Sequence, residues 1–362
     1  MQNRIGPIAA LQLVALVAAL TLGFGCGSTS KVEPAGTYVY VAQAQRSTQT
    51  GVWVGSIAQL RLHGNGMLTN LDPTTVPTSA VPSSLAVDPS GRYLLAKDSG
   101  TILEYAIEND GTLTLAPPTG VTAFTAVFTP DGHFVITTGV GSDGLPSNTL
   151  NVYSFGSDGL LTLVGNAGIT SQAGPIAVDA SSRFVYFGSP NDNRIYEYSL
   201  SGGTLTPIGS IAAGSINPFW LSASPKGFLY SPINGAGGGV NEFQINASNG
   251  TLGQVSSFVV CPNGGGFPVA FTPSGEYAYT SCGGTVSQFS VDATTGMFAP
   301  NGPNLSNVGV MTMDPSGKFA FAFTDVDTVS QFNVGANGTL SPNGSVVLST
   351  TMLGQSIVST YR

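Results

Sequence analysis

Residues 82–113 read PSSLAVDPSGRYLLAKDSGTILEYAIENDGTL, and the pattern of this stretch recurs along the chain. It contains two turn sequences, Asp88-Pro89-Ser90-Gly91 and Asn109-Asp110-Gly111, each flanked by alternating apolar and polar residues. Proline at the second position and glycine at the fourth favour a type I turn, because proline presets φ. Asp-Gly supplies the positive φ that a tight hairpin needs. The stretch therefore predicts a small antiparallel sheet of short strands.

Both turn sequences are repeated at regular intervals. Further copies of the first are Thr129-Pro130-Asp131-Gly132, Ser224-Pro225-Lys226-Gly227, Thr272-Pro273-Ser274-Gly275 and Asp314-Pro315-Ser316-Gly317, with a degenerate copy at Asp179-Ala180-Ser181-Ser182. The second turn ends in glycine or its equivalent at Gly66, Gly111, Gly159, Gly203, Gly250, Gly296 and Gly338. The first and last of these glycines are 272 residues apart, so the period is about 45 residues. The repeats predict an all-β fold, a seven-bladed β-propeller with four antiparallel strands in each blade.

The two ends of the chain together supply one blade. Glu33-Pro34-Ala35-Gly36 imitates the first turn, so an inner strand is missing before it. Residues 354–361, GQSIVSTY, match the inner-strand pattern of residues 82–89, and the chain stops where the turn would follow. We therefore expect the C-terminal strand to close the first blade and remove the open edge of the ring.

A third strand between the two turns has a repeated centre, Glu or Gln followed in most units by an aromatic residue. The copies include Glu104-Tyr105, Glu197-Tyr198, Glu242-Phe243, Gln288-Phe289 and Gln331-Phe332, with Gln59-Leu60 in the first unit. The aromatic residue is expected to pack between blades. Recurrence in nearly every unit favours a structural role for the Glu or Gln over a catalytic one.

The N-terminus has the plan of an export signal. Arg4 precedes an almost unbroken apolar run, residues 5–24, which leads to Cys26 and a short polar stretch. This arrangement resembles the lipobox of bacterial lipoproteins, which implies lipid attachment at Cys26 and membrane anchoring outside the cytoplasm, facing the periplasm or the cell exterior. The alternatives are an ordinary cleaved signal or an uncleaved anchor, since about 20 apolar residues can span a bilayer.

The chain is therefore divided into three segments. Residues 1–26 are the signal peptide and lipidation site, 27–33 are a linker, and 34–362 form the propeller. The chain has 11 Lys and Arg against 19 Asp and Glu, a net charge of −8, so a phosphate backbone would be repelled and nucleic acid is excluded as a partner. We expect a monomer that binds the membrane through its N-terminal lipid and carries no cofactor.

Two further cysteines, Cys261 and Cys282, fall within one sequence repeat. In an oxidising compartment such a pair indicates a disulfide, and two buried free thiols are the alternative. A zinc site is not expected, because neither His63 nor His133 has metal-ligand spacing to these cysteines.

The order of turns and strands quoted above resembles the seven-bladed family of bacterial 6-phosphogluconolactonases and muconate-lactonising enzymes, over about residues 34–362. The resemblance implies the propeller fold, with His, Arg and Glu around the central cavity in active lactonases. In this chain the openings of the inner strands carry neither His nor Arg; they read Ser83-Ser84, Ala123-Phe124-Thr125, Gly174-Pro175, Pro218-Phe219-Trp220, Gly266-Phe267-Pro268, Val308-Gly309 and Gln355-Ser356. The family's catalytic residues do not carry over, and no catalytic residue is assigned.

The mouth of the central channel is the expected ligand site. Phe219, Trp220 and Phe267 would form an aromatic wall there, or would plug the channel as core. Asp192 and Arg194 are the charged candidates near the same mouth, or form an exposed ion pair. We expect a binding or interaction role for the propeller. The alternative is a lactonase that hydrolyses a sugar lactone or related small ester with residues in its loops.

Overall fold

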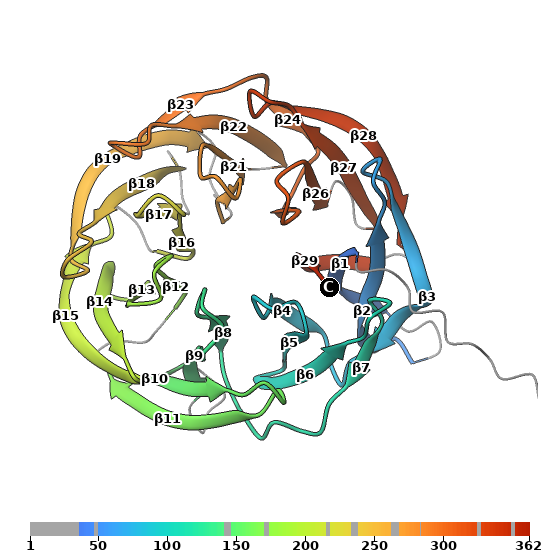
Figure 1. The fold of residues 1–362 in the computed structure, drawn as a ribbon, viewed down its shortest axis with the longest axis horizontal. Helices are drawn as coiled ribbons and strands as arrows, with labels where there is room; N and C mark the ends of the chain where they lie inside the picture. The colour runs from blue at the N-terminus through green and yellow to red at the C-terminus, as the bar shows by residue number, and fades with distance from the viewer. Residues whose placement is uncertain are drawn as a thin grey trace, which may run out of the picture. The chain divides into compact units, whose positions relative to one another are not determined.

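The computed structural model describes part of the second of two compact units, Met1–Val32 and Glu33–Arg362. The described residues are 36–46, 50–140, 146–169, 174–214, 218–232, 238–261, 268–282, 284–323, 327–348 and 352–362. They form seven antiparallel blades arranged as a ring (Figure 1), so the predicted propeller is confirmed. Cys26 and Phe267 lie outside the described residues, as do the predicted signal peptide and linker. No helix among the described residues has the length and hydrophobicity that crossing a bilayer requires.

Each blade runs from an inner strand to an outer one. Blade 1 contains β29 (Met352–Tyr361), β1 (Thr37–Arg46), β2 (Trp53–Leu62) and β3 (Leu68–Pro77). Blade 2 contains β4 (Pro82–Val87), β5 (Tyr93–Asp98), β6 (Thr101–Ile107) and β7 (Leu113–Leu115). Blade 3 contains β8 (Thr125–Phe128), β9 (Phe134–Val140), β10 (Pro146–Phe155) and β11 (Leu161–Gly168). Blade 4 contains β12 (Ile176–Val178), β13 (Phe184–Ser189), β14 (Arg194–Ser201) and β15 (Thr204–Ala212).

The last three blades follow the same order. Blade 5 contains β16 (Ser222–Ala223), β17 (Phe228–Pro232), β18 (Gly238–Ile245) and β19 (Leu252–Cys261). Blade 6 contains β20 (Ala270–Phe271), β21 (Tyr277–Cys282), β22 (Thr285–Val291) and β23 (Phe298–Pro300), with β24 (Leu305–Ser306) also paired to β22. Blade 7 contains β25 (Met311–Met313), β26 (Phe319–Phe323), β27 (Thr328–Val334) and β28 (Leu340–Val347).

The C-terminal strand closes the first blade, as predicted. β29 pairs antiparallel with β1 from Thr37 opposite Tyr361 onward. Beyond this register, Gly36 and Arg362 exchange two backbone hydrogen bonds, each 2.9 Å long. The inner position of blade 1 is thus filled by the end of the chain, and neither edge of the ring stays open.

The two repeated turns of each blade both lie at the same end of the ring, because they follow the first and third strands. All seven glycines predicted for the second turn have positive φ, between 76° and 86°. In the degenerate first turn, Ser182 itself adopts a positive φ of 60°. Its hydroxyl accepts a hydrogen bond from the backbone N–H of Asp131 in the neighbouring blade. Serine thus adopts the positive φ that glycine adopts in the first turns of blades 2, 3, 5, 6 and 7, and its side chain adds a contact between blades.

Every blade places an aromatic ring on a glycine of the next blade. The rings stand at the first or, for Tyr38, the second position of the second strand, and a Cβ on the partner glycine would come within 2.1–3.3 Å of them. The pairs are Tyr38 with Gly111, Tyr93 with Gly159, Phe134 with Gly203, Phe184 with Gly250, Phe228 with Gly296, Tyr277 with Gly338 and Phe319 with Gly66. Glycine is therefore required at these turns for its φ and for the absence of a side chain.

The repeated Glu and Gln residues of the third strands also join neighbouring blades. Five of them accept a hydrogen bond, 2.5–3.2 Å long, from the backbone N–H that begins the fourth strand of the next blade. The pairs are Gln59 with Leu113, Glu197 with Leu252, Glu242 with Phe298, Gln288 with Leu340 and Gln331 with Leu68. The expected structural role of these residues is confirmed.

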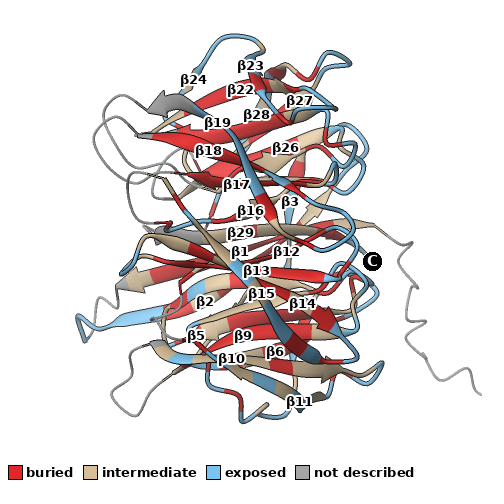
Figure 2. Cartoon of the chain, turned by 90° about the vertical axis from the view of Figure 1, so that its left-hand side faces the viewer, coloured by how far each residue is buried: buried red, intermediate tan, exposed pale blue. Residues whose placement is uncertain are grey.

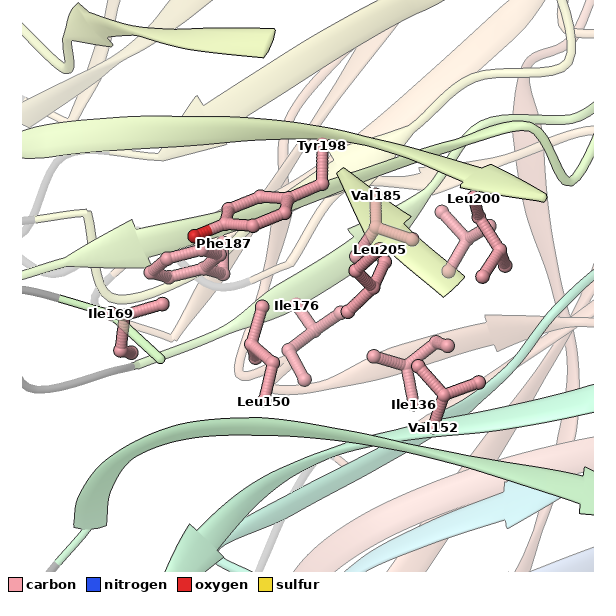
Figure 3. Packing of buried hydrophobic residues seen from close by; sticks show 11 residues of the cluster. Ile136, Leu150, Val152, Ile169, Ile176, Val185, Phe187, Tyr198, Leu200 and Leu205 are labelled. Carbon is pink, nitrogen blue, oxygen red and sulfur yellow. The ribbon is translucent and has the colours of Figure 1, made fainter. Parts of the chain in front are cut away.

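The hydrophobic core lies between blades. Figure 3 shows one cluster, in which Ile136, Leu150 and Val152 of blade 3 pack against Val185 and Phe187 of blade 4 and their neighbours. The predicted inter-blade packing of the third-strand aromatics is confirmed, because Tyr105, Tyr198, Phe243, Phe289 and Phe332 all belong to such clusters. Most buried residues lie within the strands, whereas the turns and parts of the outer strands β11 and β15 are exposed (Figure 2).

The two cysteines of the predicted disulfide belong to different blades. Cys261 is the last residue of β19 in blade 5, and Cys282 is the last residue of β21 in blade 6. The sequence repeat does not coincide with the blade, because the inner strand of blade 6 precedes its first turn. The side chains of both cysteines lie outside the described part of the structure, so the bridge stays a prediction.

We predict that Ile357→Ala destabilises the ring by about 2–4 kcal/mol, because it leaves a cavity where β29 packs. Ile357 is 5% exposed and lies in the cluster that joins blades 7 and 1. The matched control is Tyr361→Ala on the same strand, where the side chain is 58% exposed. Urea unfolding measures both variants. Equal stability of the two variants would contradict the closing role of β29.

We predict that Glu104→Gln stabilises the protein above neutral pH. Burial, together with the charges of Asp158 and Asp88, raises the pKa of Glu104 from 4.5 to about 7. The unfolded chain ionises this carboxyl at lower pH, so stability falls as pH rises from about 4.5 to about 7. Glutamine removes that penalty, of the order of 1–3 kcal/mol after allowance for solvent screening.

Thermal unfolding of Glu104→Gln and wild type at pH 4 and pH 8 measures this effect. The melting temperatures should agree at pH 4, where both side chains are neutral, and the variant should melt higher at pH 8. Glu108→Gln, an exposed position in the same blade, is the control and should show no gain. A gain of the same size at both pH values would exclude ionisation as the cause.

Candidate ligand-binding site

An open cavity of about 940 Å³ lies at the end of the ring where the inner strands begin, opposite the repeated turns. Its walls come from the starts of β29, β4, β8, β12 and β16, which surround the centre of the ring in Figure 1. The lining residues are Ser83, Ser84, Leu85, Lys97, Phe124, Thr125, Ala126, Val127, Gly174, Pro175, Ile176, Pro190, Asn191, Phe219, Trp220, Leu221 and Ser356. The described lining residues come from five of the seven blades, so several blades together position the site.

Three aromatic side chains form an exposed wall of this cavity. Phe219 and Trp220 precede β16, as the sequence predicts for the channel mouth, and each is 42% exposed. Phe124 precedes β8 and is 40% exposed. Because these rings are open to solvent, Phe219 and Trp220 do not plug the channel as core. Large exposed apolar side chains grouped around a hollow are typical of a ligand-binding site.

Lys97 adds a positive charge to the same wall. It stands near the end of β5, directly opposite Ser84 of β4. Its Nζ lies 4.8 Å from the centroid of the Phe124 ring, a cation–π contact that is worth roughly 0.5–2 kcal/mol according to its solvation. Partial burial lowers the pKa of Lys97 below that of a free lysine. The wall thus combines flat apolar faces with one cation.

Sequence reasoning missed Lys97, although a signal exists. In each blade, the aromatic residue that contacts the next blade lies at or next to the start of the second strand. In blade 2 this residue is Tyr93, and Lys97 stands four positions beyond it. The equivalent residues of the other blades are Ala42, Thr138, Gly188, Pro232, Ser281 and Phe323. All six are uncharged, so the lysine departs from the repeat. A departure from an otherwise apolar or small position marks a residue that the blade scaffold does not require.

Asp192 and Arg194, the charged residues predicted for the mouth, do not line this cavity. Arg194 begins β14 and donates to the hydroxyl and the carbonyl of Ser210 on β15, at 3.0 and 2.9 Å. Asp192 accepts a hydrogen bond from Tyr196. Burial opposes ionisation of Asp192, but hydrogen bonds from Ser189 and Tyr196 outweigh it and lower the pKa. Both side chains therefore make hydrogen bonds within blade 4.

The cavity offers few groups for acid–base catalysis. Among the described residues that line it there is no Asp, Glu or His, and Lys97 is the one ionisable side chain. The buried carboxylates Glu197 and Glu242 accept hydrogen bonds between blades, and His133 pairs with Asp131 in a turn at the opposite end. The described residues also contain no group of three His, Cys, Asp or Glu side chains that could hold a metal ion.

Comparison with known proteins identifies the fold. No protein-family model matches the chain, and neither does any curated protein. A Bacteroides uniformis protein provisionally named as a 6-phosphogluconolactonase has a similar structure, with a TM-score of 0.68 and 18% identity over 90% of this chain and 99% of that one. The periplasmic gluconolactonase PpgL of Pseudomonas aeruginosa gives a TM-score of 0.67 and 16% identity over 90% of this chain and 99% of its own.

A more distant neighbour belongs to a different enzyme. Hydrazine synthase of Kuenenia stuttgartiensis gives a TM-score of 0.56 and 16% identity over 76% of this chain and 88% of that one. At such identities the likeness concerns architecture, since one fold hosts many functions. As its repeats indicate, this chain is similar in fold to the seven-bladed propellers named as bacterial 6-phosphogluconolactonases.

Proposed function

We propose that this protein is an exported binding propeller whose open cavity takes a small organic ligand. The observation that carries the proposal is the exposed aromatic wall of Phe124, Phe219 and Trp220 around a hollow of about 940 Å³. Cavities of roughly 300–1,000 Å³ with apolar walls and a few polar groups are the usual size and character of small-molecule sites. The hydroxyls of Ser83, Ser84 and other lining residues supply the polar groups.

Lipid attachment at Cys26 is part of this proposal. The described part of the propeller begins at Gly36. The backbone of Gly36 is hydrogen-bonded to that of Arg362, which follows β29 at the end far from the cavity. The cavity residue Ser356 pairs with Ala42, about 20 Å farther along the chain from Gly36. A tether preceding Gly36 would therefore join the ring at the end that lies away from the cavity. A Cys26→Ser variant should lose fatty acylation and either leave the membrane fraction or stay there as an unprocessed precursor. Unchanged membrane attachment of the variant, with no lipid on the wild-type protein, would contradict lipid anchoring.

Lactone hydrolysis is the second candidate function. Its support is the likeness in fold to structures named as gluconolactonases. Opening a lactone needs a base or an activated water, together with stabilisation of the oxyanion. In the described part of the cavity wall, Lys97 is the one ionisable side chain and therefore the one candidate for the base. A binding role requires no such chemistry and is therefore preferred.

We predict that the purified protein hydrolyses glucono-δ-lactone no faster than the buffer blank, because the described lining residues provide no carboxylate or imidazole base. A pH-indicator assay at fixed ionic strength measures the rate. Turnover above the blank that is lost in Lys97→Met would support the lactonase and overturn the preference for a binding role.

The chain's two tryptophans allow a direct test of ligand binding. Trp220 lines the cavity, whereas Trp53 is 48% exposed on β2 outside it. In a Trp53→Phe variant, titration with phenylacetate should change Trp220 fluorescence saturably, because the ligand displaces water from the ring. The converse variant, Trp220→Phe, reports from Trp53 and should show no saturable change. Identical responses of the two variants would contradict binding in the cavity.

A further inference from the structure

We infer that the ligand of this cavity is a small organic anion and that Lys97 binds its negative charge. The inference rests on the proposed binding function and adds the chemical class of the ligand. It follows from the position of one cation in an apolar cavity of an acidic protein.

The charge of Lys97 is left without a counter-ion by the described residues. The chain carries a net charge of −8, yet the interaction recorded for Lys97 is with the Phe124 ring and no ion pair involves it. The adjacent carboxylate, Asp98, projects from the opposite face of β5, since side chains alternate along a strand. Its Oδ2 accepts hydrogen bonds from the Ser79 hydroxyl and the Ala80 N–H, at 2.6 and 2.8 Å.

Partial burial makes this unpaired cation costly. Desolvation disfavours the charged ammonium and lowers the pKa of Lys97. The ring of Phe124 compensates only in part, because a quadrupole attracts a cation more weakly than a carboxylate does. An anion that enters the cavity would restore the electrostatic stabilisation that the ammonium loses when water is excluded. Lysine at this position is therefore explained by a ligand that brings the negative charge.

A hydrogen-bond donor stands beside Lys97. Ser84 is its cross-strand partner on β4 and lines the same cavity. Directly opposed residues of an antiparallel pair place their Cβ atoms about 4.5–5.5 Å apart on one face of the sheet. The hydroxyl of Ser84 and the ammonium of Lys97 can thus approach the two oxygens of one carboxylate or two oxygens of a phosphate monoester.

The aromatic wall determines the rest of the ligand. Phe219 and Trp220 expose flat faces to the same cavity, and such faces favour a planar or apolar group. A free inorganic anion would leave those faces in contact with water. The structure therefore indicates an organic acid with its charge at one end, and a carboxylate and a phosphate monoester share that chemistry.

The experiment compares charged and neutral probes of one shape. In the Trp53→Phe background, phenylacetate should bind about tenfold or more tightly than phenylacetamide, because only the acid pairs with Lys97. Phenyl phosphate tests the phosphate monoester, and inorganic phosphate tests whether the apolar group is needed. Inorganic phosphate that competes as well as phenylacetate would overturn the assignment of an organic anion.

Variants at Lys97 complete the test. Lys97→Met should reduce phenylacetate affinity to that of the amide and leave phenylacetamide binding unchanged, whereas Lys97→Arg should retain the preference. Lys226→Met, at an exposed turn position, is the matched control and should behave as wild type. Equal affinity of acid and amide would overturn the anion inference while the binding function stands. Failure of both probes to bind would instead contradict the proposed function.

Discussion

The contact between an aromatic ring and a glycine turn of the neighbouring blade is the constraint on which the rest of this structure depends. A single blade cannot bury both of its faces, so each blade is stable only between two others. The ring on glycine fixes the spacing at every junction, and at five junctions a Glu or Gln that accepts a backbone N–H does so too. Phe319 on Gly66 and Gln331 with Leu68 repeat this arrangement between the last blade and the first. These contacts gather at one end of the ring, and the loops at the other end are free to form a cavity.

The scaffold and the site differ in how far the sequence predicts them. The turns are predictable because glycine, proline and aspartate are each required for a physical reason that repeats around the ring. Trp220 is predictable because an inner strand must begin at the channel mouth. Lys97 was missed because it lies within a strand, and Asp192 and Arg194 do not line the cavity because β14 and β15 bind their side chains. A search for repeats finds the residues that recur in every blade, whereas a residue such as Lys97 that occurs in one blade only is missed.

Shifted pKa values in this protein mark structural positions as well as functional ones. Glu104, Glu197 and Glu242 all have raised pKa values because they are buried between blades. Perturbed carboxyls commonly indicate a catalytic site, yet none of these three lines the cavity. Glutamine occupies the same position in three other blades and makes the hydrogen bond that Glu197 and Glu242 make. A structural carboxyl can therefore be told from a catalytic one by asking whether the neutral isostere glutamine occupies the equivalent position in another blade.

The strand β29 makes completion of the fold depend on a segment that is synthesised long after its partner β1. β1 can find its inner partner only after more than 300 residues have followed it, and contacts between such distant segments form slowly. Until then the inner edge of β1 is unpaired, which is a hazard for aggregation. A premature stop codon anywhere before β29 thus yields an open ribbon of blades and not a smaller propeller. Closure of the ring therefore requires that translation continues through β29.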